Sequence, residues 1–146
     1  MYLTQLEADT FLKLDKVFLN TPQLQLGNIE IDETHDLSSL DQREFFLLDI
    51  SRCRLNFKKI RFQNRSRIVN ILARVDLVGA PHRNPDGEIL ECPHIHIYRE
   101  GYNDKWAYQI SNFITIRDTS NIVSSLEDFA VFCNIINLPP IQYKHV

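Results

Sequence analysis

The sequence predicts an α+β fold: a curved, mostly antiparallel sheet with one helix near each end of the chain. Helix-periodic segments open and close the chain, and between them short runs rich in β-branched and aromatic residues alternate with turn residues. No repeat or linker interrupts the sequence, so we expect residues 1–146 to form a single domain. The strand-rich middle leaves a partly closed barrel open as an alternative to an open sheet.

Both helices carry end signals. In residues 2–19, Thr4 and Glu7 have the spacing of a capping box, which marks a helix N-terminus. In residues 125–136, Ser125 is the expected N-cap, and the prolines that follow would stop the helix. We therefore expect helices over both ranges.

The strands are expected between the helices. They are short runs rich in Ile, Val, Phe and Tyr, bounded by turn residues. The expected segments are residues 24–32, 43–51, 54–62, 67–80, 89–100 and 105–110.

The segment NPDG, residues 84–87, predicts a tight hairpin. Proline suits the first central position of a type I turn, and Gly87 supplies the left-handed residue that follows, which forms a G1 bulge. If Asn84 pairs with Glu88 across this turn, Asp76 lies opposite His96.

This register places the chemically reactive side chains of the hairpin on one face and apolar ones on the other. The polar face gathers Arg74, Asp76, His94, His96 and Tyr98, with Arg74 opposite Tyr98. Lys105 from the next strand could join it. His82 points the same way, but at about 3.4 Å per residue it would lie on the order of 10 Å beyond the row of His94.

Three interpretations of this face stay open. In the first, His96 is a general acid or base oriented by Asp76, His94 is the second proton-transfer group, and Arg74 or Lys105 stabilises phosphate charge. In the second, His94, His96 and Asp76 hold a divalent metal, the one cofactor considered, although no fourth ligand stands out. In the third, the face is a solvated strand surface with a cross-strand Asp–His pair.

The middle of the chain is strongly basic in a protein whose net charge is -3. Residues 51–83 hold nine basic side chains and a single acidic one. We expect them to form a stripe that contacts the phosphates of RNA or DNA, made by Arg52, Arg54, Lys58, Lys59, Arg61, Arg65 and Arg67. The alternative is an edge strand that uses basic residues to prevent aggregation.

Composition and motif content exclude several classes of protein. Three cysteines without a repeated spacing argue against a disulfide framework. No apolar run has the length of a membrane span, and the N-terminus lacks the layout of a signal peptide, so we expect a soluble cytoplasmic protein. No P-loop, dinucleotide fingerprint, HExxH or CxxC motif is present.

Residues 72–110, LARVDLVGAPHRNPDGE…PHIHIYREGYNDKWAYQI, resemble the signature of a family of small uncharacterised bacterial and mobile-element proteins. That signature runs ARxD, PHxNPDG and HxHIYREGYxDKWA. A fainter similarity, confined to PHIHIY, links the chain to small proteins found beside toxin–antitoxin genes. The resemblance implies a setting and no catalytic residue.

The leading hypothesis is a small bacterial nucleic-acid-acting protein, specifically a toxin-like ribonuclease or phosphodiesterase. It combines the basic stripe with the His/Asp/Arg face. The alternative is a non-catalytic, phage- or defence-associated module that docks through its basic surface to nucleic acid or to a protein such as an antitoxin or defence component. A metal-dependent enzyme acting on a small molecule is the third hypothesis.

Overall fold

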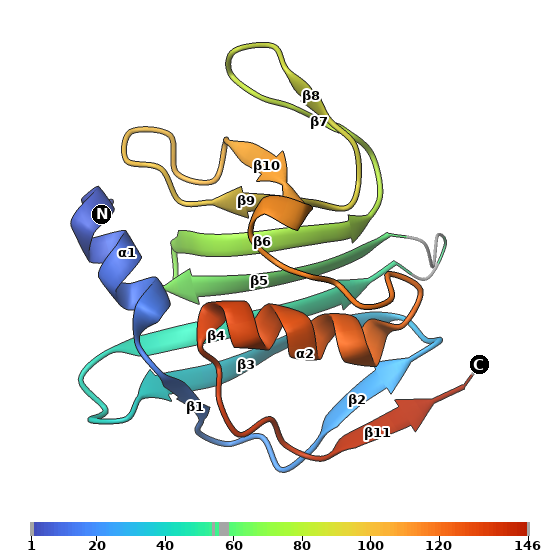
Figure 1. The fold of residues 1–146 in the computed structure, drawn as a ribbon. Helices are drawn as coiled ribbons and strands as arrows, with labels where there is room; N and C mark the ends of the chain where they lie inside the picture. Colours follow the sequence, from blue (N-terminus) through green and yellow to red (C-terminus); the bar gives the residue numbers. More distant parts are fainter. Residues whose placement is uncertain (1, 54, 56–58, 146) are drawn as a thin grey trace.

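The computed structural model describes residues 2–53, 55 and 59–145, and a seven-stranded antiparallel sheet dominates it (Figure 1). Its strands are β1 (Lys16–Phe18), β3 (Ile31–Ser39), β4 (Phe45–Arg52), β5 (Ile60–Ser66), β6 (Asn70–Val78), β9 (His94–Ile97) and β10 (Ala107–Gln109). They lie in the order β1-β3-β4-β5-β6-β9-β10, so the sheet is open and not a barrel. The predicted α+β fold is confirmed.

Smaller elements complete the fold. They are α1 (Gln5–Lys13), the 3-10 helix η1 (Ile110–Asn112), α2 (Ile122–Cys133), the parallel pair β2 (Leu24–Gly27) and β11 (Ile141–Lys144), and the hairpin β7 (His82–Arg83) and β8 (Ile89–Leu90). Helix α2 crosses one face of the sheet, and β7–β8 projects from one end of the molecule (Figure 1). In the described part of the chain, no helix is long and apolar enough to cross a membrane.

The capping box of the first helix is confirmed: Thr4 accepts a hydrogen bond from the Glu7 amide, and the Glu7 carboxylate accepts one from the Thr4 amide. The predicted extent, residues 2–19, is wrong, because the helix ends at Lys13 and the chain enters β1. The side chain of Lys16 explains the early end. It is fully buried, and its ammonium donates to the carbonyls that end both helices, those of Leu12, Leu14 and Cys133.

The N-cap of the second helix is Asn121, and the prediction of Ser125 is wrong. The Asn121 side chain accepts hydrogen bonds from the amides of Val123 and Ser124. Ser125 lies inside the helix, where its hydroxyl donates to the Asp118 carbonyl. The helix therefore begins one turn earlier than its periodicity indicates.

The core lies between α2 and the covered face of the sheet. Along one row of paired strands, Ile50, Phe62, Val75 and Ile95 are fully buried. The rings of Phe62 and Phe129 lie 5.9 Å apart, which joins the sheet to α2. Because side chains alternate along a strand, the opposite face receives the polar residues.

One strand prediction fails where it matters for the basic stripe. Residues 54–62 are not a continuous strand, because β4 ends at Arg52 and β5 begins at Ile60. Arg54 and Lys58 lie outside the described residues. The basic alternation at these two positions stays a prediction, whereas Lys59 lies between the two strands.

Candidate active site

The turn at residues 84–87 forms as predicted. The Asn84 amide donates to the Glu88 carbonyl at 2.8 Å, and Gly87 has a positive φ of 92°. The adjoining pair His82–Leu90 has the predicted register.

That register does not continue into the main sheet. There Asp76 lies opposite His94, and Arg74 lies opposite His96, so both predicted pairings are wrong. The shift spans two residues and therefore keeps the same side chains on the same face. It arises because the pairs Asp76–His94 and His82–Leu90 are separated by five residues on one side, 77–81, and by three on the other, 91–93.

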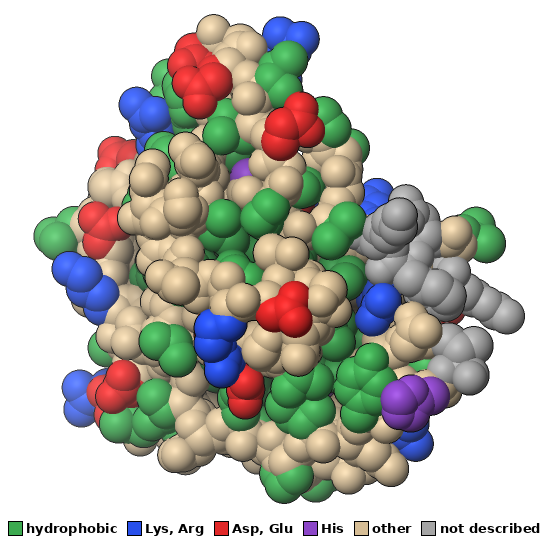
Figure 2. Space-filling view, turned by 45° about the vertical axis from the view of Figure 1, so that its right-hand side comes forward, with side chains coloured by type: hydrophobic (Ala, Val, Ile, Leu, Met, Phe, Trp, Pro, Cys, Tyr) green, Lys and Arg blue, Asp and Glu red, His purple; other side chains and the backbone are tan. Residues whose placement is uncertain are grey.

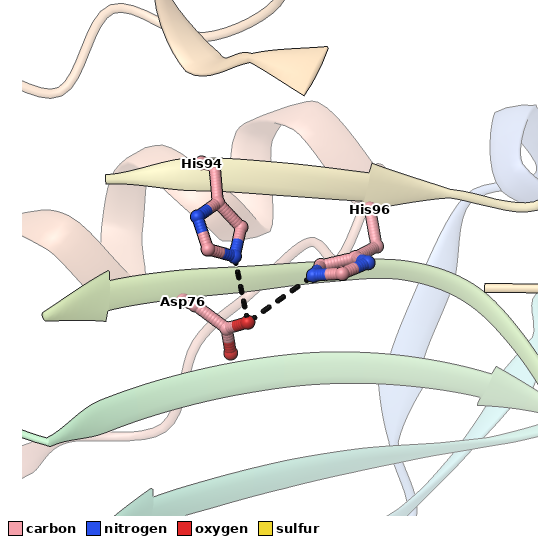
Figure 3. A group of neighbouring side chains, drawn as sticks. All are labelled: Asp76, His94 and His96. Carbon is pink, nitrogen blue, oxygen red and sulfur yellow. Dashed lines mark hydrogen bonds and ion pairs between the residues drawn. The ribbon is translucent and has the colours of Figure 1, made fainter. Parts of the chain in front are cut away.

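The polar face brings an aspartate and two imidazoles together (Figure 3). Arg61, Asp76 and His94 lie directly opposite one another on β5, β6 and β9. Asp76 Oδ2 is 3.0 Å from His94 Nε2 and 3.2 Å from His96 Nε2. Both imidazoles are buried. The three side chains therefore share one face as predicted, although their cross-strand pairing differs from the prediction.

Two guanidinium groups also bind Asp76. Arg61 Nε donates to Oδ1 at 2.7 Å, and Arg74 Nη2 donates to Oδ2 at 3.3 Å. Burial alone would raise the pKa of Asp76, but the hydrogen bond from His94 and the charges of both arginines outweigh it. The net pKa lies far below its ordinary value, so the carboxylate stays ionised.

His96 positions Arg74. Its Nδ1 lies 2.7 Å from the Asp104 carbonyl, which can only accept, so Nδ1 carries the proton. Burial lowers the pKa of His96 and outweighs the opposing contact with Asp76, so the ring is neutral. Its Nε2 lone pair then accepts from Arg74 Nη2 at 2.9 Å. This contact leaves His96 no free nitrogen for a substrate.

Two predicted site residues act elsewhere. The Tyr98 hydroxyl is buried and exchanges hydrogen bonds with the backbone of Leu3, donating to its carbonyl and accepting from its amide. The Lys105 side chain is exposed, whereas its backbone carbonyl lies 2.8 Å from His82 Nε2. Tyr98 anchors the N-terminal segment, and Lys105 contributes its backbone to the site.

His82 joins the cluster, contrary to the sequence-based expectation. Its ring centroid is 4.5 Å from that of His96 and 6.0 Å from that of His94. The cause is Asn84, whose side chain donates to the Ala107 carbonyl at 2.9 Å and accepts from the Ala107 amide at 2.8 Å. This pairing ties the hairpin to β10 and folds His82 back over the histidines. The break at Gly79–Pro81 was the signal that the ladder does not run straight.

A pocket of about 180 Å³ opens beside the cluster. The charged and imidazole side chains that line it are Lys59, Arg61, Arg74, Asp76, His82 and His94, and residues 78–81 form part of its wall. His96 is not part of this lining. The pocket therefore joins the N-terminal part of β5, from the basic segment, to the histidine face.

The other described residues of the basic stripe, Arg52, Arg65 and Arg67, form hydrogen bonds or ion pairs within the protein. Arg65 binds Asp49 through two hydrogen bonds of 2.6 and 2.8 Å, Arg67 lies 3.5 Å from Glu44, and Arg52 donates to a backbone carbonyl. In the view of Figure 2, basic and acidic side chains are interspersed and form no continuous basic area among the described residues. Among the described residues of the stripe, Lys59 and Arg61 are the ones that line the pocket.

The aspartate and the two buried imidazoles of the polar face are also the candidate metal donors. Asp76, His94 and His96 each offer an atom within 4.8 Å of the others, the donor set of a 2-His-1-carboxylate centre. Arg74 Nη2 already contacts His96 Nε2 and Asp76 Oδ2. A divalent ion would have to displace this guanidinium to reach all three donors.

A family model described as "Family of unknown function (DUF6978)" matches residues 3–135. The chain belongs to this family. The matched range of DUF6978 contains the whole seven-stranded sheet, α2 and every residue of the pocket. No curated protein and no solved structure matches the chain.

Proposed function

We propose that this DUF6978 protein is a small nucleic-acid-acting enzyme that binds a phosphodiester in the pocket and cleaves RNA by imidazole acid–base catalysis. One observation carries the proposal: three cations and a single carboxylate line a pocket that also contains imidazoles. The resemblance of residues 72–110 adds the bacterial, toxin-like setting.

The pocket has cationic groups to spare for an anion. Asp76 and Asp104, the second partner of Arg74, neutralise two of the charges of Lys59, Arg61 and Arg74, and one positive charge is left. Arg61 uses Nε on Asp76, and within the described residues its terminal nitrogens have no partner. Its side chain is 40% exposed, and Lys59 is exposed as well. A guanidinium edge held by a carboxylate and open to solvent is suited to a phosphate, which it can bind through two parallel hydrogen bonds.

The imidazoles supply ring nitrogens that can accept or donate a proton. His94 lines the pocket, and its Nε2 is held by Asp76. His96 Nε2 accepts a hydrogen bond from Arg74. We therefore do not assign His96 the role of general base that the sequence predicted. Phosphodiester cleavage requires a group that binds the phosphate and a group that accepts a proton, and the proposed pocket contains both.

Cleavage of a fluorescent single-stranded RNA in the presence of EDTA tests the proposal. We expect the purified protein to cleave it, and Arg61→Gln to lose at least about tenfold in rate, since one charge-assisted contact is worth about 1.4 kcal/mol or more. Arg117→Gln is the matched control, because Arg117 pairs with Glu127 and Asp128 on the surface. The absence of cleavage would refute the proposal. Salt-sensitive binding without cleavage would favour the docking module instead.

A metal-dependent hydrolase is the second candidate, favoured by the converging donors of Asp76, His94 and His96. It requires the untagged protein to contain a stoichiometric divalent metal and EDTA to abolish activity. In that case Arg74→Met should raise metal affinity, because the competing guanidinium is gone.

A further inference from the structure

We infer that His82 is the general base of the site, taking the proton from the attacking 2′-hydroxyl of RNA. The inference rests on the proposed function and names the atom at which the proton moves, Nδ1 of His82. The sequence placed this histidine outside the site, and the fold returns it to the pocket.

The hydrogen bonding of His82 fixes where its lone pair lies. Nε2 is 2.8 Å from the Lys105 carbonyl, and a carbonyl oxygen can only accept, so Nε2 carries the proton of the neutral ring. Nδ1 is then the basic nitrogen. Within the described residues it has no hydrogen-bond partner, and the side chain is half-buried in the lining of the pocket.

The neighbouring imidazoles are engaged at both nitrogens. His96 binds Asp104 through Nδ1, while Nε2 contacts Arg74 and Asp76. His94 faces Asp76 with Nε2, and its Nδ1 lies 3.2 Å from the Glu91 carbonyl. His82 is therefore the imidazole whose lone pair is available to a substrate. Its ring packs edge-on against that of His96, which fixes its orientation.

The proton acceptor shares its pocket with the phosphate-binding cations. Lys59, Arg61 and Arg74 line the pocket together with His82. A phosphodiester held by Lys59 and Arg61 brings its attached ribose into the same small space. The geometric requirement for base catalysis is met when the 2′-oxygen comes within hydrogen-bond reach of Nδ1.

The reaction balances without any cofactor. His82 Nδ1 takes the proton of the 2′-hydroxyl as the 2′-oxygen forms its bond to phosphorus. The bond from phosphorus to the 5′-oxygen breaks, and the leaving oxygen keeps the electron pair and takes a proton from water. The products are a 2′,3′-cyclic phosphate and a 5′-hydroxyl, and His82 returns its proton to solvent. DNA lacks the attacking hydroxyl and is not cleaved.

His82→Gln is the sharpest variant, because the glutamine amide can still donate to the Lys105 carbonyl but offers no basic nitrogen. We expect its cleavage rate to fall by about 10²–10⁴-fold with unchanged RNA binding and thermal stability. Added imidazole should restore cleavage by His82→Gly. The control is His35→Gln, since His35 contacts Thr21 and Glu33 away from the pocket.

The outcomes separate the two proposals. If the wild-type protein cleaves RNA and His82→Gln cleaves equally fast, the role of His82 is wrong while the proposed function stands. An RNA with a 2′-deoxy substitution at the cleaved linkage should resist the wild-type protein, and its cleavage would also overturn the role of His82. If the wild-type protein cleaves nothing, both proposals fall.

Discussion

Asp76→Asn tests whether the carboxylate organises the site. It removes the negative charge that binds Arg61 and Arg74 while keeping the size of the side chain. Removing one partner of a buried ion pair costs about 3–5 kcal/mol, because the remaining charge loses its compensation. Arg61 is 40% exposed and water will solvate it, and Arg74 keeps Asp104 at 3.0 Å. We therefore expect the lower end, a loss of about 3 kcal/mol in the free energy of unfolding.

Urea unfolding at neutral pH measures this loss. Asp128→Asn is the control, because its partner Arg117 is largely exposed and a surface pair contributes little. The loss should shrink in acid. The pKa of Asp76 is lowered on folding, so its stabilisation is complete above about pH 4 and declines as the pH falls towards the folded-state pKa. An Asp76→Asn variant as stable as the wild type would refute the view of Asp76 as the organising charge.

Three further predictions concern the elements that support the site. Burial lowers the pKa of Lys16 to about 8, so above that pH the unfolded chain binds more protons than the folded one. The free energy of unfolding should therefore rise by about 1 kcal/mol from about pH 7 to about pH 9. A Lys16→Met variant that shows the same rise in urea titrations would contradict this. Asn84→Ala leaves the Ala107 amide and carbonyl unpaired and should cost about 2 kcal/mol or more, with faster amide exchange in residues 82–90; unchanged exchange would show that the hairpin is held otherwise. Gly27→Ala places a methyl group against the Lys144 carbonyl at a φ of 130°, and should lower the melting temperature; an unchanged value would mean that β11 moves freely aside.

Local chemistry predicted a large part of the fold. The capping box at Thr4 and Glu7 and the turn at residues 84–87 depend on neighbouring residues alone, and both formed as expected. The alternation of apolar and polar residues also assigned Asp76, His94 and His96 to one face correctly. These features are fixed by backbone preferences and by the period of two along a strand.

The remaining features depend on contacts between distant residues. The two-residue shift between Asp76 and His94 follows from the unequal connections around the hairpin, which turn chemistry alone does not set. The return of His82 depends on Asn84 reaching Ala107 on a later strand. The sequence predicts Arg65 as a phosphate contact, whereas in the structure Asp49 on the adjacent strand binds it.

Nitrogen NMR of the imidazoles, during titration with an RNA made uncleavable by 2′-deoxy substitution, tests the central claim most directly. We expect the free protein to have the His82 proton on Nε2, and RNA binding to shift the Nδ1 signal of His82 while leaving His35 unchanged. A His82 ring with its proton on Nδ1, or RNA binding that shifts no pocket histidine, would contradict it.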